Sequence, residues 1–280
     1  MKLENILEYE VYKGYVEITG CNGYAEGEMI IPETIEGLPV TSIGVSAFGY
    51  QSFLKSVTIP KSVTNIGNGA FQECSSLKSI TIPDSITNIG TGAFSYCFAL
   101  EKIHVAPGNH YYMDIDGVLF SKDQKILVTY PAGKLDQSYF IPDSVTRIGE
   151  MAFYYCDSLL SVTIPNNVTI IGWEAFSSCS SLKSITIPDS VTDIEESAFC
   201  CCDSLTSITI PNNVTTIRWL AFSSCSSLES IIIQNAKCEI GNYYDQGVTL
   251  SDTAVIYGYP DSTAQAYAKK YNREFVALKD

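Results

Sequence analysis

The stretch from Ile141 to Ile233 consists of four copies of one 23-residue unit, which follow one another without a gap. The spacing is kept by the aromatic and the thiol positions alike: Phe153, Phe176, Phe199 and Phe222, and Cys156, Cys179, Cys202 and Cys225. A unit this short cannot bury its apolar residues until a neighbouring copy stacks against it. The repeat therefore predicts one coil of a solenoid per copy, and its regularity indicates a structural requirement rather than a catalytic one.

The letters within each unit predict which faces the coil forms. In SLKSITIP, the side chains of Leu77, Ile80 and Ile82 point inward from a short strand, and stacked copies would build one continuous parallel sheet. The segment V-T-x-I-G-x-x-A-F on the opposite side favours a short strand and a single turn of α- or 3₁₀-helix. We therefore expect a β-rich, right-handed and curved solenoid, with a parallel sheet on one face and short strands and turns on the other.

The repeats organise the whole chain into a single elongated domain. We expect an N-terminal β cap at 1–31, regular repeats at 32–105, an irregular insert at 106–141, the four regular repeats at 142–233 and a C-terminal cap at 234–280. In the insert, DGVLF and KILVTYP flank SKDQ as a hairpin, and both VTYP and YFIP are predicted to join the common sheet. The last cap reads as the strand AVIYGY, the helix DSTAQAYAKKYN and the strand EFVAL.

Charge and hydropathy limit the partners that the chain can have. The net charge is -14, from 31 acidic and 17 basic residues, and would repel nucleic acid. An apolar stretch near the roughly 18 residues of a membrane span is absent, so membrane insertion is not expected. The start, MKLENILEYE, does not read as a secretion signal, which predicts a protein that stays inside its cell or an exported one whose signal has been removed. We expect a monomer.

Six of the ten cysteines recur three residues after the repeat phenylalanine: Cys74, Cys97, Cys156, Cys179, Cys202 and Cys225. Such a row is typical of small buried apolar side chains. The one close group, Cys200 to Cys202, lacks the ligand spacing of a zinc site, so no metal or other cofactor is expected. Cys200 and Cys201 are predicted to lie on an outward turn, where free thiols fit a reducing environment.

The chain resembles the BspA-like family of leucine-rich repeats from about Val16 to Leu278. The resemblance rests on the irregular DGVLF...LVTYPAGK...YFIPDSV unit, the ending IYGYPDSTAQAYAKKYN, and six copies of IPxSVTxIGxxAFxxCxSLxSIT, which begin at Ile59, Ile82, Ile141, Ile164, Ile187 and Ile210. It implies a leucine-rich-repeat solenoid, and a bacterial cell-surface protein that binds other proteins in the manner of an adhesin.

Outward residues of successive coils should line up in rows on the sheet. Most of these positions are Ser or Thr, which suit exposed positions of a β-strand and need no functional explanation. The exceptions near the insert are Lys102, His104, Phe140 and Leu160, and there we predict contact with a protein partner.

Trp173 and Trp219 occupy one repeat position two coils apart, with Glu196 between them, and should be roughly 10 Å from each other. Aromatic side chains on a rigid scaffold can anchor a protein or stack on a sugar ring. The alternative is that the two rings cover apolar surface at the turn.

The sequence contains few of the residues and motifs that catalysis requires. The only histidines are His104 and His110, and the sequence contains neither a G-x-S-x-G elbow nor a phosphate-binding loop. We therefore predict a non-catalytic recognition module that binds a protein or a glycan on a rigid surface, adhesin-like and on the cell surface. An intracellular interaction scaffold is the alternative, and a hydrolase with its site in the insert is a third reading.

Overall fold

The computed structural model describes residues 6–23, 25–242 and 249–279. The chain forms two compact units, Met1–Lys134 and Leu135–Asp280, which we call unit 1 and unit 2 and describe separately. Parts of the two predicted caps, residues 1–5, 24, 243–248 and 280, lie outside the described residues. The domain boundaries expected from the sequence stay a prediction.

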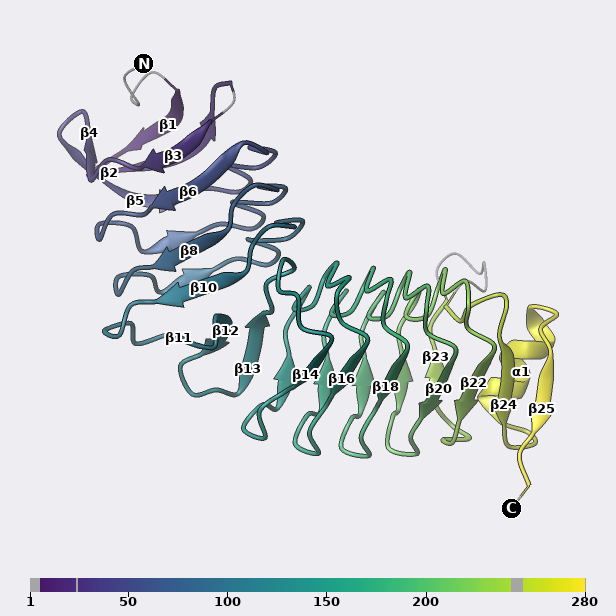
Figure 1. Cartoon of the computed structure of the whole chain (residues 1–280). Helices are drawn as coiled ribbons and strands as arrows, with labels where there is room; N and C mark the ends of the chain where they lie inside the picture. The colour runs from purple at the N-terminus through teal and green to yellow at the C-terminus, as the bar shows by residue number, and fades with distance from the viewer. Residues whose placement is uncertain (1–5, 24, 243–248, 280) are drawn as a thin grey trace. The chain divides into compact units, whose positions relative to one another are not determined.

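Unit 1 begins with an antiparallel hairpin and continues as coils with a strand on each side. The hairpin is β1 (Leu7–Tyr12) and β2 (Tyr15–Cys21), and alternate residues of β2, Val16 and Ile18, are fully buried. The strands of the sheet face are β3 (Gly27–Ile30), β6 (Leu54–Thr58), β8 (Ser79–Ile82) and β10 (Lys102–Val105). The opposite face carries β4 (Thr34–Ile35), β5 (Leu38–Ile43), β7 (Asn65–Ile66) and β9 (Asn88–Ile89). Figure 1 shows β6, β8 and β10 side by side in this unit.

The insert of unit 1 is antiparallel. Its strands are β11 (Tyr112–Ile115), β12 (Val118–Ser121) and β13 (Ile126–Thr129). β12 pairs with β13 around SKDQ, which confirms the predicted hairpin. Within this insert, VTYP pairs antiparallel with β12, and Thr129 lies opposite Leu119. A four-residue connection turns the chain back on itself, as an antiparallel pair requires.

Unit 2 has the same plan in a more regular form. Its sheet face consists of β14 (Ser138–Phe140), β16 (Ser161–Thr163), β18 (Ser184–Thr186), β20 (Ser207–Ile210), β22 (Ser230–Ile233), β24 (Val255–Gly258) and β25 (Phe275–Ala277). The two-residue strands behind it are β15 (Arg147–Ile148), β17 (Ile170–Ile171), β19 (Asp193–Ile194), β21 (Thr216–Ile217) and β23 (Glu239–Ile240). The C-terminal helix α1 (Thr263–Lys270) lies within the predicted DSTAQAYAKKYN segment, and its N-cap is Ser262.

Two details of the coils differ from the expectation. The sheet face of unit 2 is divided into a three-stranded sheet, β14-β16-β18, and a four-stranded sheet, β20-β22-β24-β25, instead of being continuous. The segment around each A-F pair is built of turns, where one turn of helix was also considered. The turn arises because one residue before the Ala-Phe pair, such as Glu174 or Ser197, has a left-handed backbone with φ of 51° or 55°. A left-handed residue interrupts a right-handed helix.

A stack of phenylalanine rings runs through the core of each unit. In unit 2, the ring of Phe176 lies 4.8 Å from that of Phe153 and 5.1 Å from that of Phe199, and the planes are nearly parallel. Phe48 and Phe71 stack at 5.3 Å in unit 1. All of these rings are fully buried. The identical spacing of Phe in the sequence is therefore the spacing of one continuous row of rings within each unit.

Backbone hydrogen bonds join each coil to the next at the same place. The Phe176 N–H donates to the Ala198 carbonyl at 2.8 Å, and the Phe199 N–H donates to Ala221 at 2.8 Å. The glycine of the repeat is a position of close approach, because a Cβ on Gly172 would lie 2.8 Å from the Ile148 carbonyl oxygen. The φ of Gly172 is not positive, so close approach of the neighbouring coil, and not a left-handed backbone, favours glycine here.

The recurring cysteines form a buried row as predicted. The Cys179 thiol donates to the Phe153 carbonyl at 3.0 Å, and the Cys202 thiol donates to Phe176 at 3.2 Å. Burial raises the pKa of the Cys179 thiol to about 12 and opposes its ionisation. The row is therefore a set of small neutral side chains that also satisfy backbone carbonyls.

The ring stack predicts a large effect of Phe176→Ala on stability. Loss of a fully buried ring with two stacked neighbours should lower the free energy of unfolding by about 3–5 kcal/mol, measured by urea denaturation. Phe140→Ala is the control, because this ring is 72% exposed in the same unit, and its loss should cost less than about 0.5 kcal/mol. Equal losses in the two variants would contradict the role of the stack.

The buried thiols predict that stability falls at alkaline pH. Below the thiol pKa of the unfolded chain, about 8.5, both states keep the Cys179 proton. Above it the unfolded chain releases the proton and the folded protein retains it up to about pH 12, so unfolding is favoured by about 1.4 kcal/mol per pH unit for this thiol. Urea midpoints from pH 7.5 to 9.5 should fall less steeply for Cys179→Ala than for the wild type, and parallel slopes would disprove the assignment.

Candidate functional site

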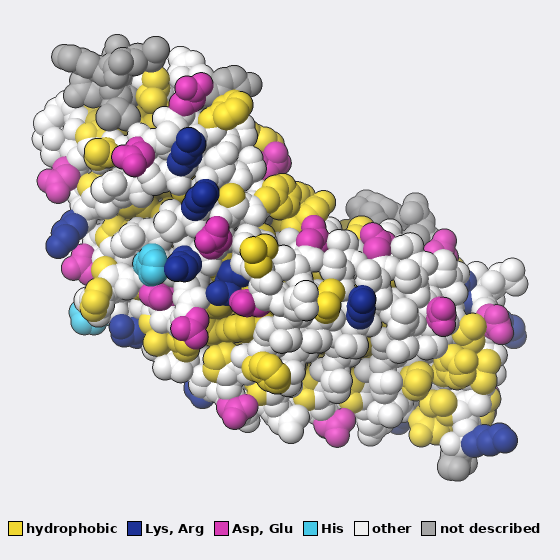
Figure 2. Space-filling model, in the orientation of Figure 1, with side chains coloured by type: hydrophobic (Ala, Val, Ile, Leu, Met, Phe, Trp, Pro, Cys, Tyr) yellow, Lys and Arg dark blue, Asp and Glu magenta, His cyan; other side chains and the backbone are white. Residues whose placement is uncertain are grey.

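The sheet face of unit 1 carries the charged residues that interrupt the Ser/Thr rows. β10 pairs with β8 in register, so His104 lies beside Thr81 and Lys102 lies beside Ser79. Lys102 and His104 are both exposed, and exposed lysines precede them on the same face at Lys55 and Lys78. Figure 2 shows basic and acidic side chains interspersed on the visible face of this unit. This face therefore presents a mixed, charged surface on regular strands.

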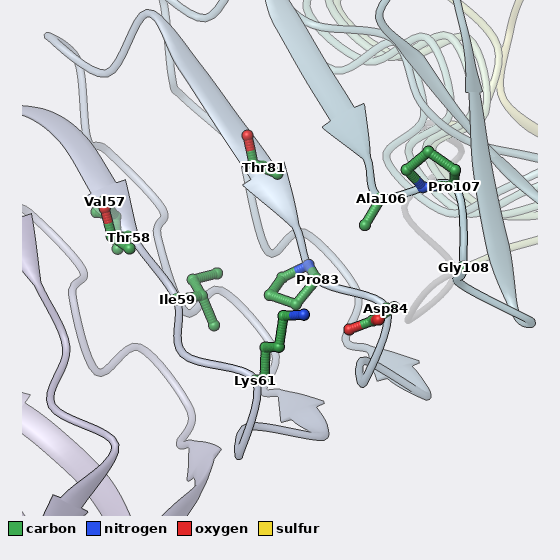
Figure 3. A pocket seen from close by; sticks show the side chains of 10 residues that line it. All are labelled: Val57, Thr58, Ile59, Lys61, Thr81, Pro83, Asp84, Ala106, Pro107 and Gly108. Carbon is green, nitrogen blue, oxygen red and sulfur yellow. The ribbon is translucent and has the colours of Figure 1, made fainter.

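A pocket of about 510 Å³ lies at the ends of the same strands. Its floor is apolar, with Ile59 and Pro83 buried, while Lys61 and Asp84 on neighbouring coils supply opposite charges (Figure 3). The pocket also reaches Thr81, the row neighbour of His104. The charged face of unit 1 and the pocket are thus one continuous surface.

Phe140 and Leu160 lie at the start of the sheet face of unit 2. Phe140 pairs with Thr163 of the next strand and is 72% exposed, whereas Leu160 is half-buried and its N–H donates to the Gln137 carbonyl at 2.8 Å. Beyond them the rows consist mainly of Ser and Thr, such as Thr163 beside Thr186. The four predicted contact residues are therefore divided between two units, Lys102 and His104 in unit 1 and Phe140 and Leu160 in unit 2.

Trp173, Glu196 and Trp219 form a cluster on the other face of unit 2, each two residues after a short strand. The Glu196 carboxylate accepts hydrogen bonds from the side chains of both tryptophans, whose only side-chain donor is the indole Nε1–H. All three residues are half-buried. One carboxylate thus lies beside two half-buried indole side chains. Both sequence-based readings of the rings, partner contact and coverage of the turn, are compatible with this arrangement.

The neighbouring charges reinforce this cluster. The Glu195 carboxylate accepts a hydrogen bond from the Trp173 backbone N–H at 2.9 Å and pairs with Arg147 at 3.3 Å. Burial raises the pKa of Glu196, while the two indole hydrogen bonds and Arg218 oppose that rise. The pKa of Glu174 is also raised, first by burial and then by the charge of Glu196. The cluster therefore holds the carboxylates of Glu174 and Glu196 close together in a partly buried environment.

The two histidines do not lie in such a cluster. His104 is on β10, and His110 is in the turn before β11, and both are exposed. Across residues 6–23, 25–242 and 249–279, no three or more His, Cys, Asp and Glu side chains come together in a way that could hold a metal ion. Within the same ranges, no helix combines the length and the apolar character needed to cross a membrane.

Sequence reasoning grouped the two tryptophans with Glu196 and missed the rest of the cluster. The ion pair between Arg147 and Glu195 spans two coils, and Glu195 also supports Trp173. A signal existed in the repeat, because Glu195 and Arg218 stand where other copies have Gly. Two charged residues at a position of close approach mark the coils where the repeat departs from its usual turn.

Stacked coils with a parallel sheet on one side and short strands on the other define the class of leucine-rich-repeat solenoids. The family model described as the BspA type leucine rich repeat region matches residues 31–127 and 133–249, in six copies. The chain belongs to this family. Among curated proteins, no sequence matches the chain.

Solved structures agree with the fold. The pneumococcal vaccine antigen PcpA is similar over 99% of this chain and 98% of its own, with 18% identity and a TM-score of 0.66. A leucine rich cell surface protein from Faecalibacterium prausnitzii matches 98% of this chain and 93% of its own, with 24% identity and a TM-score of 0.54. A leucine-rich repeat protein from Bacteroides ovatus covers 90% and 70%, with 27% identity and a TM-score of 0.55.

The tryptophan cluster predicts a fluorescence titration, since Trp173 and Trp219 are the only tryptophans of the chain. Glu196 has a raised pKa, so its protonation should change the indole emission with a midpoint above the usual glutamate value of about 4.3. Glu196→Gln should abolish the transition, because no charge is left to titrate between the indoles. Glu174→Gln is the matched control and should keep it, and a transition that survives in Glu196→Gln would contradict the hydrogen bonds.

Proposed function

We propose that this chain is a non-catalytic recognition module that binds a protein partner on the ordered faces of its solenoid. One observation carries the proposal: the strands pair in register, so that Thr163, Thr186 and their neighbours present their side chains in fixed rows. The inward residues between them, such as Val162 and Ile185, are buried in the core. A surface that is already ordered loses little conformational entropy when a partner binds, which favours affinity.

The residues that depart from the uniform rows are the proposed contacts. In unit 1 these are Lys102 and His104, beside the pocket with the apolar floor of Ile59 and Pro83. In unit 2 the proposed contact is the exposed ring of Phe140 together with Leu160. Aromatic anchors and apolar pockets are the features that contribute most to protein interfaces. Ser and Thr rows around them would supply a polar rim.

A glycan is the second candidate partner, and the cluster of Trp173, Glu196 and Trp219 favours it. Indole rings held in a fixed orientation offer flat apolar faces, and a neighbouring carboxylate can accept hydrogen bonds from sugar hydroxyls. This cluster lies on the face opposite the Ser/Thr rows, so a glycan and a protein partner would use different surfaces of unit 2.

A place on the cell surface and an adhesin-like role are part of the proposal. They are supported by the family and by the similar protein from Faecalibacterium prausnitzii that is named a cell surface protein. An intracellular interaction scaffold is the alternative, and it would use the same faces. A hydrolase with its site in the insert would need His104 or His110 against a carboxylate and a nucleophile; both side chains are exposed.

Capture experiments on the intact chain test the proposal. A protein retained by the wild type should be retained at least about tenfold less by Lys102→Ala/His104→Ala or by Phe140→Ala/Leu160→Ala, because loss of an interface anchor costs 1–2 kcal/mol or more. Ser184→Ala/Thr186→Ala on the uniform rows is the matched control and should bind as the wild type does. A glycan array probes the second candidate, where Trp173→Ala/Trp219→Ala should lose any signal.

Two outcomes would contradict these assignments. Unchanged capture by both face variants would remove the sheet faces of the two units as the binding surface. Equal loss in the Ser184→Ala/Thr186→Ala control would show that the effect is not specific to the residues that break the rows.

A further inference from the structure

Cys200 and Cys201 form a pair of neighbouring thiols on the turn after Phe199 in unit 2. Their sulfur atoms are 3.5 Å apart, and both residues are half-buried. The coils on either side carry two serines at the same place, Ser177 and Ser178 before and Ser223 and Ser224 after. The dithiol is therefore an addition to the repeat and is not required by its packing.

The pair differs from the other cysteines in access and in hydrogen bonding. Cys202 and Cys225 are fully buried, and their thiols donate to the carbonyls of Phe176 and Phe199. Burial and the hydrogen bond with Cys201 raise the pKa of Cys200 to about 12. The two sulfurs share one hydrogen bond, in which either thiol can be the donor. Cys21 is the other half-buried thiol among the described cysteines, and it belongs to unit 1.

We propose that Cys200 and Cys201 are a reversible modification site that reacts with small disulfides and closes into a disulfide between the two residues. The Cys201 thiolate attacks one sulfur of a disulfide RSSR, which forms a mixed disulfide and releases one RS⁻. Cys200 then gives up its proton and attacks the Cys201 sulfur, which releases the second RS⁻. Two protein thiols are oxidised, and one external disulfide is reduced to two thiols.

The backbone makes this bond easy to reverse. Adjacent Cα atoms are about 3.8 Å apart across a trans peptide, which is shorter than the 4.4–6.8 Å that relaxed disulfides span. Closure therefore strains the turn, and strained disulfides are the ones that thiols reduce readily. The pair fits a switchable modification better than a structural cross-link.

This inference is independent of the proposed binding function, because it concerns chemistry at the thiols alone.

Mass spectrometry of the whole folded chain tests the pair directly. The reduced protein is treated with 2-hydroxyethyl disulfide at pH 8, quenched with acid and digested. The peptide that holds Cys200 and Cys201 should lose about 2 Da in the wild type, since closure removes two hydrogens, and dithiothreitol should restore it. Cys200→Ser and Cys201→Ser should each stop at the mixed disulfide or remain unmodified, because the closing partner is missing.

The double variant Cys200→Ser/Cys201→Ser is the matched control, since it reproduces the serine pairs of both flanking coils and should fold as they do. A loss of about 2 Da from the intact mass of this variant would place the bond elsewhere and overturn the proposal. A wild-type peptide in which Cys200 and Cys201 both remain free thiols, or that stays as the mixed disulfide, would also overturn it. A closed product that dithiothreitol does not reduce would refute the reversible site.

Discussion

The contact between one coil and the next is the constraint on which the rest of the structure depends. A repeat phenylalanine such as Phe176 contributes twice, through a ring that stacks on the rings of both neighbouring coils and through an N–H that donates to the alanine carbonyl of the next coil. The cysteine three residues later donates its thiol to the phenylalanine carbonyl of the preceding coil, as Cys202 does to Phe176. A single coil would leave these groups without partners, so stability comes from neighbours.

This constraint explains why so much of the fold could be predicted. The ladder between coils allows no slip, because a shift of one residue would take Phe176 out of the stack and its N–H away from Ala198. The 23-residue spacing therefore fixes at once the register of the strands, the buried row of cysteines and the outward rows of Ser and Thr. The helix after Ser262 could be predicted for a different reason, because its N-cap and the apolar face formed by Ala264, Tyr267 and Ala268 are local sequence signals.

The repeat pattern did not predict contacts between side chains that occur in only one or two copies of the repeat. The bond between Arg147 and Glu195 joins two coils through long side chains at positions that usually carry other residues. The convergence of two indoles on Glu196 depends on turn directions set by left-handed residues such as Glu174 and Ser197, which no single amino acid type marks.

The same ladder explains how this chain can carry a cluster of charged and aromatic residues without losing its fold. At the glycine position, the Gly172 N–H donates to the Ile148 carbonyl at 3.0 Å. The N–H groups of Glu195 and Arg218 make the equivalent bonds to Ile171 and Ile194 at 3.0 and 2.9 Å. The backbone bond is therefore kept when the side chain changes, even where a Cβ on the usual glycine would be crowded. The backbone groups of neighbouring coils hydrogen-bond to each other, so the side chains at the turns are not needed for these bonds. Substitutions at the turns can therefore introduce a binding site or a thiol pair without loss of the fold.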